Sequence, residues 1–378
     1  MTDMTGHTEV TPAQTGLASS RPVYFLLNQF IPPDPAPTAR LAADIMEALP
    51  EIEWCPIGTD RAYRSPGSGF VQRLMREWKD LRTLGRSARC RARPEAIVAL
   101  SSPPMLLLEA VQVGRSHGVP VHHWILDLYP DVAVALHQVP ALVGRGLALP
   151  MRAALAACAS VTAVDEAMAW RVEQRYGIRC GVCRPWPERI PDEPFPGWPG
   201  VPHDAPVWLY SGNLGQAHDW ETLVEIQTLL EQRRTPWWLV VQGGGKGWEK
   251  ARQAADQRGL RQCAFRPYAT PGQLGGALAW ARVGVATQRE ETAGMLWPSK
   301  VAALAERAQA VLWIGPRPEG ATHPLLNRTD VGSFRPGEAE AAAAWLESIR
   351  NGSPAPAVLN RVGARDVGLA YWRQRLLP

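Results

Sequence analysis

Short apolar runs alternate with longer stretches of helical periodicity along most of this chain. Each apolar run has the length of a buried strand, and those in the first half are residues 23–28, 96–100, 119–125 and 160–164. The segments between them repeat apolar residues at helical spacing, at 38–49, 105–117, 144–158 and 166–176. Because parallel strands need crossover helices, this alternation predicts a parallel sheet with helices on both faces.

A proline-rich stretch then interrupts the pattern. Residues 184–206 hold prolines too closely spaced for a helix or a central strand, so we interpret them as an interdomain connection. Strands are expected again at 208–210, 237–242, 263–266, 283–286 and 311–314. Helices are expected at 219–234, 247–258, 271–280, 299–308 and 338–349. The predicted fold class is therefore α/β, with two Rossmann-like domains that face each other across a cleft.

These changes in pattern divide the chain into five segments. Polar residues 1–20 are expected to form a disordered tail, and residues 21–190 an N-terminal Rossmann-like domain. A proline-rich linker at 191–205 leads to a second Rossmann-like domain at 206–360. The amphipathic segment 361–378 is expected to be a C-terminal helix that crosses back to the first domain.

Composition and charge narrow the function classes. The chain of 378 residues is 46% apolar and 20% charged, as in ordinary globular proteins. Its net charge of +4 is too small to indicate a nucleic-acid binder. It has no apolar run long enough to span a membrane and no N-terminal signal core, so we expect a cytoplasmic protein.

The six cysteines are scattered and do not suggest a disulfide framework. Cys180 and Cys183 have a spacing found in zinc sites, but no second pair and no neighbouring histidine accompany them. We therefore interpret them as two reduced thiols at a strand beside the linker.

The most informative local feature is a glycine turn between a strand and a helix. Gly212, Asn213 and Gly215 follow the strand at 208–210, and the helical pattern begins at 219. Such a turn aims unpaired backbone N–H groups at one point, which favours an anion such as phosphate. The alternative is a glycine that serves packing alone, as in many α/β proteins.

Three more strand ends of the second domain carry polar or glycine residues, namely Gly243 and Gly244, Arg266 and Tyr268, and Gly294, Ser299 and Lys300. Ser299 is placed to cap the helix that follows it, with Lys300 in the first turn. A lysine there opposes the helix dipole, so stability alone does not explain it. If a diphosphate is bound there, the lysine ammonium and the backbone N–H groups would both form hydrogen bonds to it. A solvated surface lysine is the alternative.

The order of these motifs resembles the C-terminal half of the GT-B glycosyltransferases, in particular family 4 members of the bacterial surface polysaccharide, colanic-acid-type branch. The matching elements there are Ser211-Gly212-Asn213, Gly215 with His218, Gly243–Gly245, Phe265 with Pro267-Tyr268, and Gly294 with Pro298-Ser299-Lys300. In the first half the similar stretches are 27–34, 36–38, 127–131 and 164–168. The resemblance covers nearly the whole chain from Arg21.

This resemblance implies a glycosyltransferase that moves a sugar from a nucleotide sugar, with UDP- or GDP-sugar favoured, to an acceptor held by the first domain. It implies retention of configuration with no metal and no cofactor. The work of a metal would fall to positive charge and a helix N-terminus, which stabilise the leaving diphosphate. The implied donor-binding residues are Gly212, Asn213, Gly215, His218, Gly243, Gly244, Arg266, Tyr268, Gly294, Ser299, Lys300 and Glu306. Asp127 and Lys300 are the implied catalytic residues.

The chain also departs from the family pattern. The two positions of the family's Glu-x7-Glu pair fall on Met295 and Ala303, and Glu306 lies one helical turn beyond as a substitute. At two positions where many relatives carry a cationic side chain, this chain has Asn213 and His218. These departures leave open a catalytically degenerate homologue that acts as a scaffold in polysaccharide assembly, and a nucleotide-sugar epimerase of the same fold.

In the first domain, Asp127 ends a strand and so lies at the expected cleft. It is interpreted either as a contact to sugar hydroxyls or as a turn aspartate before Pro130. For His122 and His123 we favour ordinary packing over a role in the cleft.

Residues 61–93 contain ten arginines and lysines against two acids. Within them Arg73, Arg76, Trp78 and Arg82 belong to a basic amphipathic helix, which can lie on an anionic membrane. This would suit a saccharide acceptor carried on polyprenyl diphosphate, with the protein peripheral at the inner face of the cytoplasmic membrane. The alternative is a core-packed helix with a solvated basic face.

Overall fold

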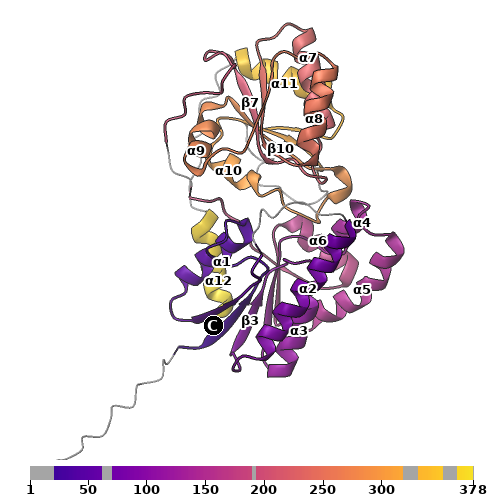
Figure 1. Cartoon of the computed structure of the whole chain (residues 1–378), viewed down its shortest axis with the longest axis vertical. Helices are drawn as coiled ribbons and strands as arrows, with labels where there is room; N and C mark the ends of the chain where they lie inside the picture. The colour runs from indigo at the N-terminus through magenta and orange to yellow at the C-terminus, as the bar shows by residue number, and fades with distance from the viewer. Residues whose placement is uncertain (1–20, 62–69, 190–192, 318–330, 352–363, 378) are drawn as a thin grey trace, which may run out of the picture.

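The computed structural model describes residues 21–61, 70–189, 193–317, 331–351 and 364–377. These residues form two six-stranded parallel sheets in two stacked domains (Figure 1). The first sheet has the order β2-β1-β3-β4-β5-β6. Its strands are β1 (Val23–Leu27), β2 (Glu53–Ile57), β3 (Ala96–Ala99), β4 (Val121–Ile125), β5 (Ser160–Ala163) and β6 (Gly181–Val182).

Helices cover both faces of the first sheet because successive strand residues point in opposite directions. Phe25 and Ile97 pack with the helices α2 (Phe70–Arg89) and α3 (Leu106–His117), whereas Leu26 and Val98 belong to the other large core cluster. The helices of this domain are α1 (Pro37–Ala48), α2 (Phe70–Arg89), α3 (Leu106–His117), α4 (Asp131–Ala135), α5 (Ala141–Ala156) and α6 (Glu166–Tyr176).

The second sheet has the order β12-β11-β10-β7-β8-β9. Its strands are β7 (Val207–Asn213), β8 (Trp238–Gly244), β9 (Cys263–Arg266), β10 (Val283–Thr287), β11 (Val311–Ile314) and β12 (Val331–Phe334). The helical segments are α7 (Glu221–Gln232), α8 (Lys246–Gln257), α9 (Pro271–Trp280), the short 3-10 turn η1 (Glu290–Thr292), α10 (Lys300–Arg307) and α11 (Ala339–Asn351). Within the described ranges, no helix combines the length and apolar character that crossing a bilayer requires.

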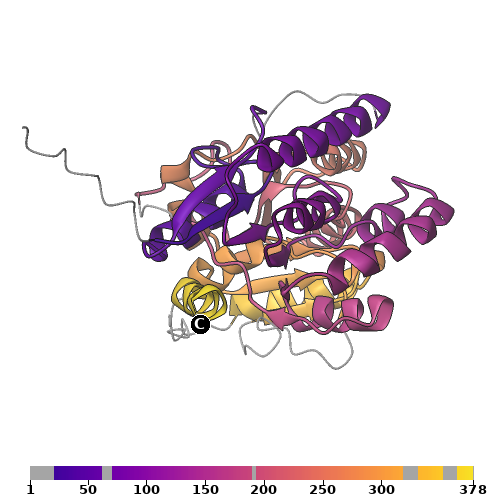
Figure 2. The ribbon, with the colours of Figure 1, turned by 90° about the horizontal axis from the view of Figure 1, so that it is seen from below.

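The last helix, α12 (Ala364–Leu376), crosses back and packs on the first domain (Figures 1 and 2). The Trp372 ring is fully buried with its centroid 5.3 Å from that of Trp124. Arg365 forms a 2.9 Å ion pair with Asp44 of α1. The crossing expected from the sequence is therefore confirmed.

Two edge strands, β2 and β12, were absent from the predicted set. β2 contains Pro56, and β12 contains Gly332, whose backbone lies against the Trp345 ring. Proline and glycine weaken a strand signal and are tolerated at sheet edges. The central strands were predicted because they are continuous apolar runs buried on both faces.

Candidate functional site

The strand order of the second sheet reverses between β7 and β10. The chain leaves β7 toward β8 and β9 on one side, and later returns to β10, β11 and β12 on the other. The crevice at the carboxyl ends of two such strands is where ligands bind in open α/β sheets. The glycine turn of residues 211–215 lies at the end of β7, so it occupies this crevice.

A second glycine turn packs directly on the first one. Gly243 has φ +143°, and a Cβ atom on it would lie 2.0 Å from the carbonyl oxygen of Gly212. A Cβ atom on Gly245 would lie 2.3 Å from Oδ1 of Asn213. The Leu214 N–H donates to the Gly244 carbonyl over 2.8 Å, which holds the two turns together. The close approach of the two turns thus requires glycine at 243 and 245.

Lys300 reaches this pair of turns from the first position of α10. Its Nζ lies 4.8 Å from the centroid of the Tyr210 ring and 3.4 Å from Nε2 of His218. Its Cε lies 3.4 Å from the position that a Cβ atom on Gly212 would take. Gly212 and His218 were predicted from one motif and Lys300 from another, and the structure brings them together.

His218 connects the two strands of the reversal point. Its Nδ1 lies 2.6 Å from the carbonyl oxygen of Thr287, the last residue of β10. Since a carbonyl can only accept, Nδ1 carries the proton and Nε2 presents its lone pair to Lys300. Burial, assisted by the charge of Lys300, lowers the pKa of His218 to about 3. The ring is therefore neutral and acts as an acceptor for the ammonium group.

The charge of Lys300 has little compensation. Burial lowers the pKa of its ammonium to about 7, and no carboxylate in the described part of the chain offsets this effect. Although solvent touches the side chain, protein atoms surround it on most sides. Such a group gains stability when an anion reaches it.

The segment before Lys300 touches both domains. Within the second domain, Arg289 forms a 2.8 Å ion pair with Glu221 at the start of α7. Toward the first domain, the Leu128 N–H donates to the Met295 carbonyl over 2.7 Å. Gly294 has φ +64°, and a Cβ atom on it would lie 2.9 Å from the carbonyl oxygen of Ala167 in α6. Residues 288–297 thus couple the position of Lys300 to the first domain.

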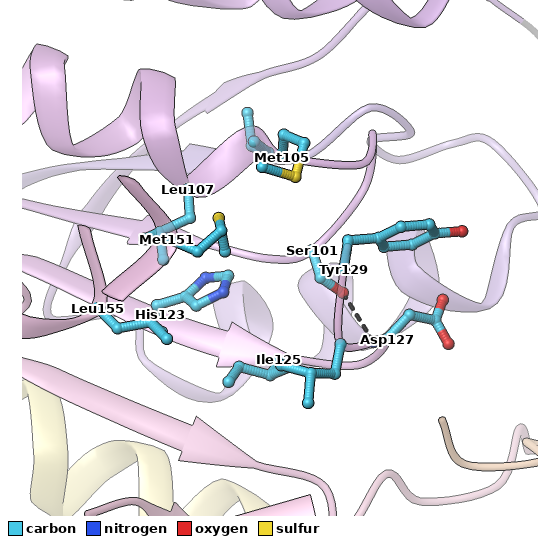
Figure 3. Close-up of a pocket in the computed structure, with 11 residues that line it drawn as sticks. Ser101, Met105, Leu107, His123, Ile125, Asp127, Tyr129, Met151 and Leu155 are labelled. Atoms are coloured by element: carbon cyan, nitrogen blue, oxygen red, sulfur yellow. Dashed lines mark hydrogen bonds between the residues drawn. The ribbon is translucent and has the colours of Figure 1, made fainter. Parts of the chain in front are cut away.

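Asp127 lies where this segment meets the first domain. It follows β4 and forms an antiparallel bridge with Leu296, and its N–H donates to the Ser101 hydroxyl over 3.1 Å (Figure 3). Asp127 is exposed to solvent on one side, yet desolvation by the surrounding protein raises its pKa to about 6. Asp127 therefore lies in a turn at the contact between the two domains.

A small apolar slot lies next to Asp127, between α3 and α5. Figure 3 shows His123 among Leu107, Met151 and Leu155 in this slot, with the Asp127 carboxylate directed away from it. His123 Nδ1 lies 2.9 Å from the Ala99 carbonyl, and burial lowers the pKa of this ring to about 4. His123 is a packed neutral side chain, as favoured from the sequence.

Other predicted residues lie in or near the crevice, but with different contacts. Tyr268 borders the second turn, since a Cβ atom on Gly244 would lie 3.1 Å from its ring. The Arg266 guanidinium donates to the Pro199 carbonyl and so holds the interdomain linker. Glu306 lies near the end of α10, two turns away from Lys300.

Ser299 occupies the N-cap position of α10, as predicted, but its side chain does not cap the helix. Its backbone is already helical, with φ −53° and ψ −26°, and its side chain makes no capping hydrogen bond among the described residues. A capping residue needs an extended backbone for its oxygen to reach the first N–H groups.

Sequence reasoning missed two contributors to this site. Tyr210 was assigned only to the strand core, yet its ring lies under the Lys300 ammonium. Its position directly before the glycine turn is the signal that could have found it. Thr287 contributes a backbone carbonyl, for which the sequence carries no signal. Over the described ranges, no group of three potential metal ligands occurs.

No model of a known protein family matches this chain. Over 101 residues it is 31% identical to the "Putative colanic acid biosynthesis glycosyl transferase WcaI" of Escherichia coli (strain K12). That segment is 27% of this chain and 24% of the relative, so the match spans about a quarter of the relative's length.

Solved structures resemble almost the whole chain. Sucrose-phosphate synthase (tll1590) from Thermosynechococcus elongatus superposes with a TM-score of 0.65 at 14% identity, over 94% of this chain and 98% of that chain. Anabaena Alr3699/HepE in complex with UDP-glucose has a TM-score of 0.60 at 13% identity, over 93% of this chain and 94% of that chain.

This chain has the GT-B fold. The fold class predicted from the alternation of strands and helices is thus confirmed. The GT-B likeness also agrees with the order of motifs from which the resemblance was drawn. At these identities it defines the fold, and the substrate must be inferred from the residues in the crevice.

Proposed function

We propose that this GT-B protein is a glycosyltransferase of cell-surface polysaccharide assembly, which transfers a sugar from a nucleotide sugar to a saccharide or lipid-linked acceptor. The observation that carries this proposal is the lysine at the reversal point. The Lys300 ammonium meets the first glycine turn with a neutral histidine beside it and no carboxylate to offset its charge in the described part of the chain. Such a group suits a diphosphate.

In the proposed reaction, the donor diphosphate is bound by Lys300 and by backbone N–H groups of the 211–215 turn other than that of Leu214, which already donates to Gly244. When the bond between sugar and phosphate breaks, negative charge grows on the leaving oxygen, and the lysine stabilises it without a metal. The acceptor attacks from the same face, with the leaving phosphate as base, so that configuration is retained. We name no enzymic nucleophile for this route.

Asp127 is the proposed contact to sugar hydroxyls. It lies at the first-domain side of the cleft, next to the segment that leads to Lys300. Its carboxylate accepts hydrogen bonds when ionised, and the raised pKa means that it is ionised above about pH 6. Asp127 would thereby orient the acceptor or the transferred sugar.

We further propose that the protein is peripheral at the inner face of the cytoplasmic membrane through α2. Trp78 is 59% exposed, and the Arg82 guanidinium lies 4.6 Å from the centroid of its ring. Arg76 is exposed as well, whereas the Arg73 side chain lies outside the described residues. The opposite face of α2 packs into the core through Leu84 and Ala88. The helix thus combines a packed face with a basic apolar outer face.

The first test is donor binding. UDP-, GDP-, dTDP- and ADP-sugars are added in turn, and the melting temperature is measured. At least one donor should raise the melting temperature, and Lys300→Ala should weaken its binding about ten- to a hundredfold, because a charge-assisted contact is lost. Lys246→Ala is the matched control, since Lys246 begins α8 beside the second glycine turn. If none of the donors binds, the glycosyltransferase proposal fails.

The same panel addresses the second candidate, a scaffold that has lost catalysis. Ala303 occupies the position of the ribose-contacting glutamate in the resemblance, and its side chain is partly buried among apolar neighbours of α10. A protein that binds none of the nucleotide sugars but still assembles with polysaccharide enzymes would support the scaffold.

A further inference from the structure

The two most exposed large apolar side chains of the described residues both lie on α5. Leu142 is 77% exposed and Leu149 is 74% exposed. They are seven residues apart and therefore lie on one face of the helix, with Gly146 and Ala153 completing the row. We call these four residues the α5 stripe. The other face of α5 already packs into the core through Met151 and Leu155.

A helix that packs on one face of a domain ordinarily presents polar residues to solvent. On α5 the outward polar residues are only Arg145 and Arg152, which border the stripe and are both exposed. Residues 132–164 contain no aspartate or glutamate, so no acid of this segment neutralises these charges. The surface is thus apolar and cationic, which is complementary to an anionic lipid surface.

A second copy of this chain is a poorer occupant of the same surface. In a two-fold contact the stripe would face itself, and the two arginines would meet the same two arginines of the other copy. Like charges without acids between them oppose such an interface. Lipid phosphates, in contrast, would pair with both arginines while acyl chains cover the leucines.

The stripe also lies on the side of the domain that carries α2. α3 contacts both α2 and α5, and the three helices form one layer against the first sheet (Figures 1 and 2). The apolar slot next to Asp127 lies within this layer, between α3 and α5. A bilayer in contact with α2 and α5 together would therefore lie next to the first-domain side of the cleft.

We propose that the α5 stripe is a second membrane contact, which inserts into the interface of an anionic bilayer and, together with α2, fixes how the first domain sits on it. The inference deepens the proposed function, because it rests on an acceptor that is carried by a lipid. Two contacts on one layer define an orientation, whereas α2 alone would leave the domain free to rotate about that helix.

The test is cosedimentation of the full chain with vesicles of phosphatidylglycerol and phosphatidylcholine in equal parts. The double variant Leu142→Ser/Leu149→Ser should bind at least about tenfold more weakly, because two leucines no longer enter the interface. Leu149→Trp should bind more tightly, because tryptophan favours the bilayer interface. Val367→Ser is the matched control, since Val367 is 60% exposed on α12, on the opposite face of the first sheet.

The charges are tested separately. Arg145→Gln/Arg152→Gln should weaken binding to these vesicles several-fold and leave binding to pure phosphatidylcholine unchanged. Unchanged binding of the leucine variant would overturn the proposal. So would a fall of the solution mass from dimer to monomer in that variant, because the stripe would then join two copies. The donor panel is independent of vesicles, so a failure of donor binding is distinguishable from a failure of this surface.

Discussion

The pKa of Lys300 leads to a quantitative prediction for donor binding. In the free protein its ammonium has a pKa of about 7, because burial disfavours the charge. A bound diphosphate would favour the charged form and raise this pKa well above its free value. Binding therefore takes up a proton wherever free Lys300 is neutral. Affinity should be highest below pH 7 and should fall as the pH rises above it.

The size of the effect follows from the fraction of charged lysine. About half of Lys300 is charged at pH 7 and about a tenth at pH 8, so the donor dissociation constant should rise about fivefold over this interval. Above pH 8 it should rise about tenfold per pH unit while the bound lysine stays protonated. His218, with a pKa of about 3, does not titrate in this range, and burial raises the pKa of Tyr210 well above its usual value. Burial is the largest single effect on the Arg289 guanidinium and lowers its pKa, but the hydrogen bond to Glu221 and the charges of the neighbouring acids together outweigh it. The pKa is therefore raised, and Arg289 keeps its charge.

Titration calorimetry at pH 7, 8 and 9 measures this effect, with the sugar nucleotide from the donor panel as ligand. A sugar nucleotide is preferable to a free nucleoside diphosphate, whose terminal phosphate titrates near pH 6. Repeating the titration in two buffers of different ionisation enthalpy gives the number of protons taken up. Lys300→Arg is the control, because a guanidinium stays charged and its affinity should not change with pH. A flat profile for the unaltered protein, or an unchanged slope in Lys300→Arg, would refute the reasoning.

Three further predictions follow from other parts of the structure. Gly243→Ala should lower the free energy of unfolding by about 3 kcal/mol in urea denaturation, because its Cβ atom would collide with the Gly212 carbonyl; Gly259→Ala, at φ +66° with no described atom within 4 Å, is the control and should cost less. The transfer rate should fall below about pH 6 as Asp127 becomes protonated, and a pH–rate profile of Asp127→Asn should lack this limb. Trp372→Ala should destabilise the first domain by about 4 kcal/mol in thermal unfolding, and a loss no larger than that of an exposed substitution would contradict the buried packing of α12.

Most of the fold was predictable because its central strands are buried on both faces. β10 and β11 stand out as short apolar runs, and the helices between strands show a clear period. The edge strands β2 and β12 were not predictable in the same way. They carry a proline or a glycine and are paired on one side only, so their strand structure depends on neighbours far away in the sequence.

The candidate site was predictable as a set of residues but not as a set of contacts. The motif order selected Gly212, His218 and Lys300, which lie up to 88 positions apart (300 − 212) and meet at one point. Where a long side chain points is decided by tertiary packing, as Arg266 shows by turning toward the linker. The Thr287 carbonyl is a backbone atom, and any residue type at that position could supply it.

The departures from the family pattern and the electrostatics of the crevice have one physical consequence in common. Where the resemblance implies cations in many relatives, this chain has Asn213 and His218, and where it implies a ribose-contacting glutamate, it has Ala303. A neutral histidine cannot share the charge of the diphosphate, so the proposed site depends on Lys300 and on backbone N–H groups. The absence of a carboxylate partner within the described residues leaves the pKa of that lysine low. The substitutions that weaken the donor site would therefore also make it sensitive to pH, and one titration series would measure both effects.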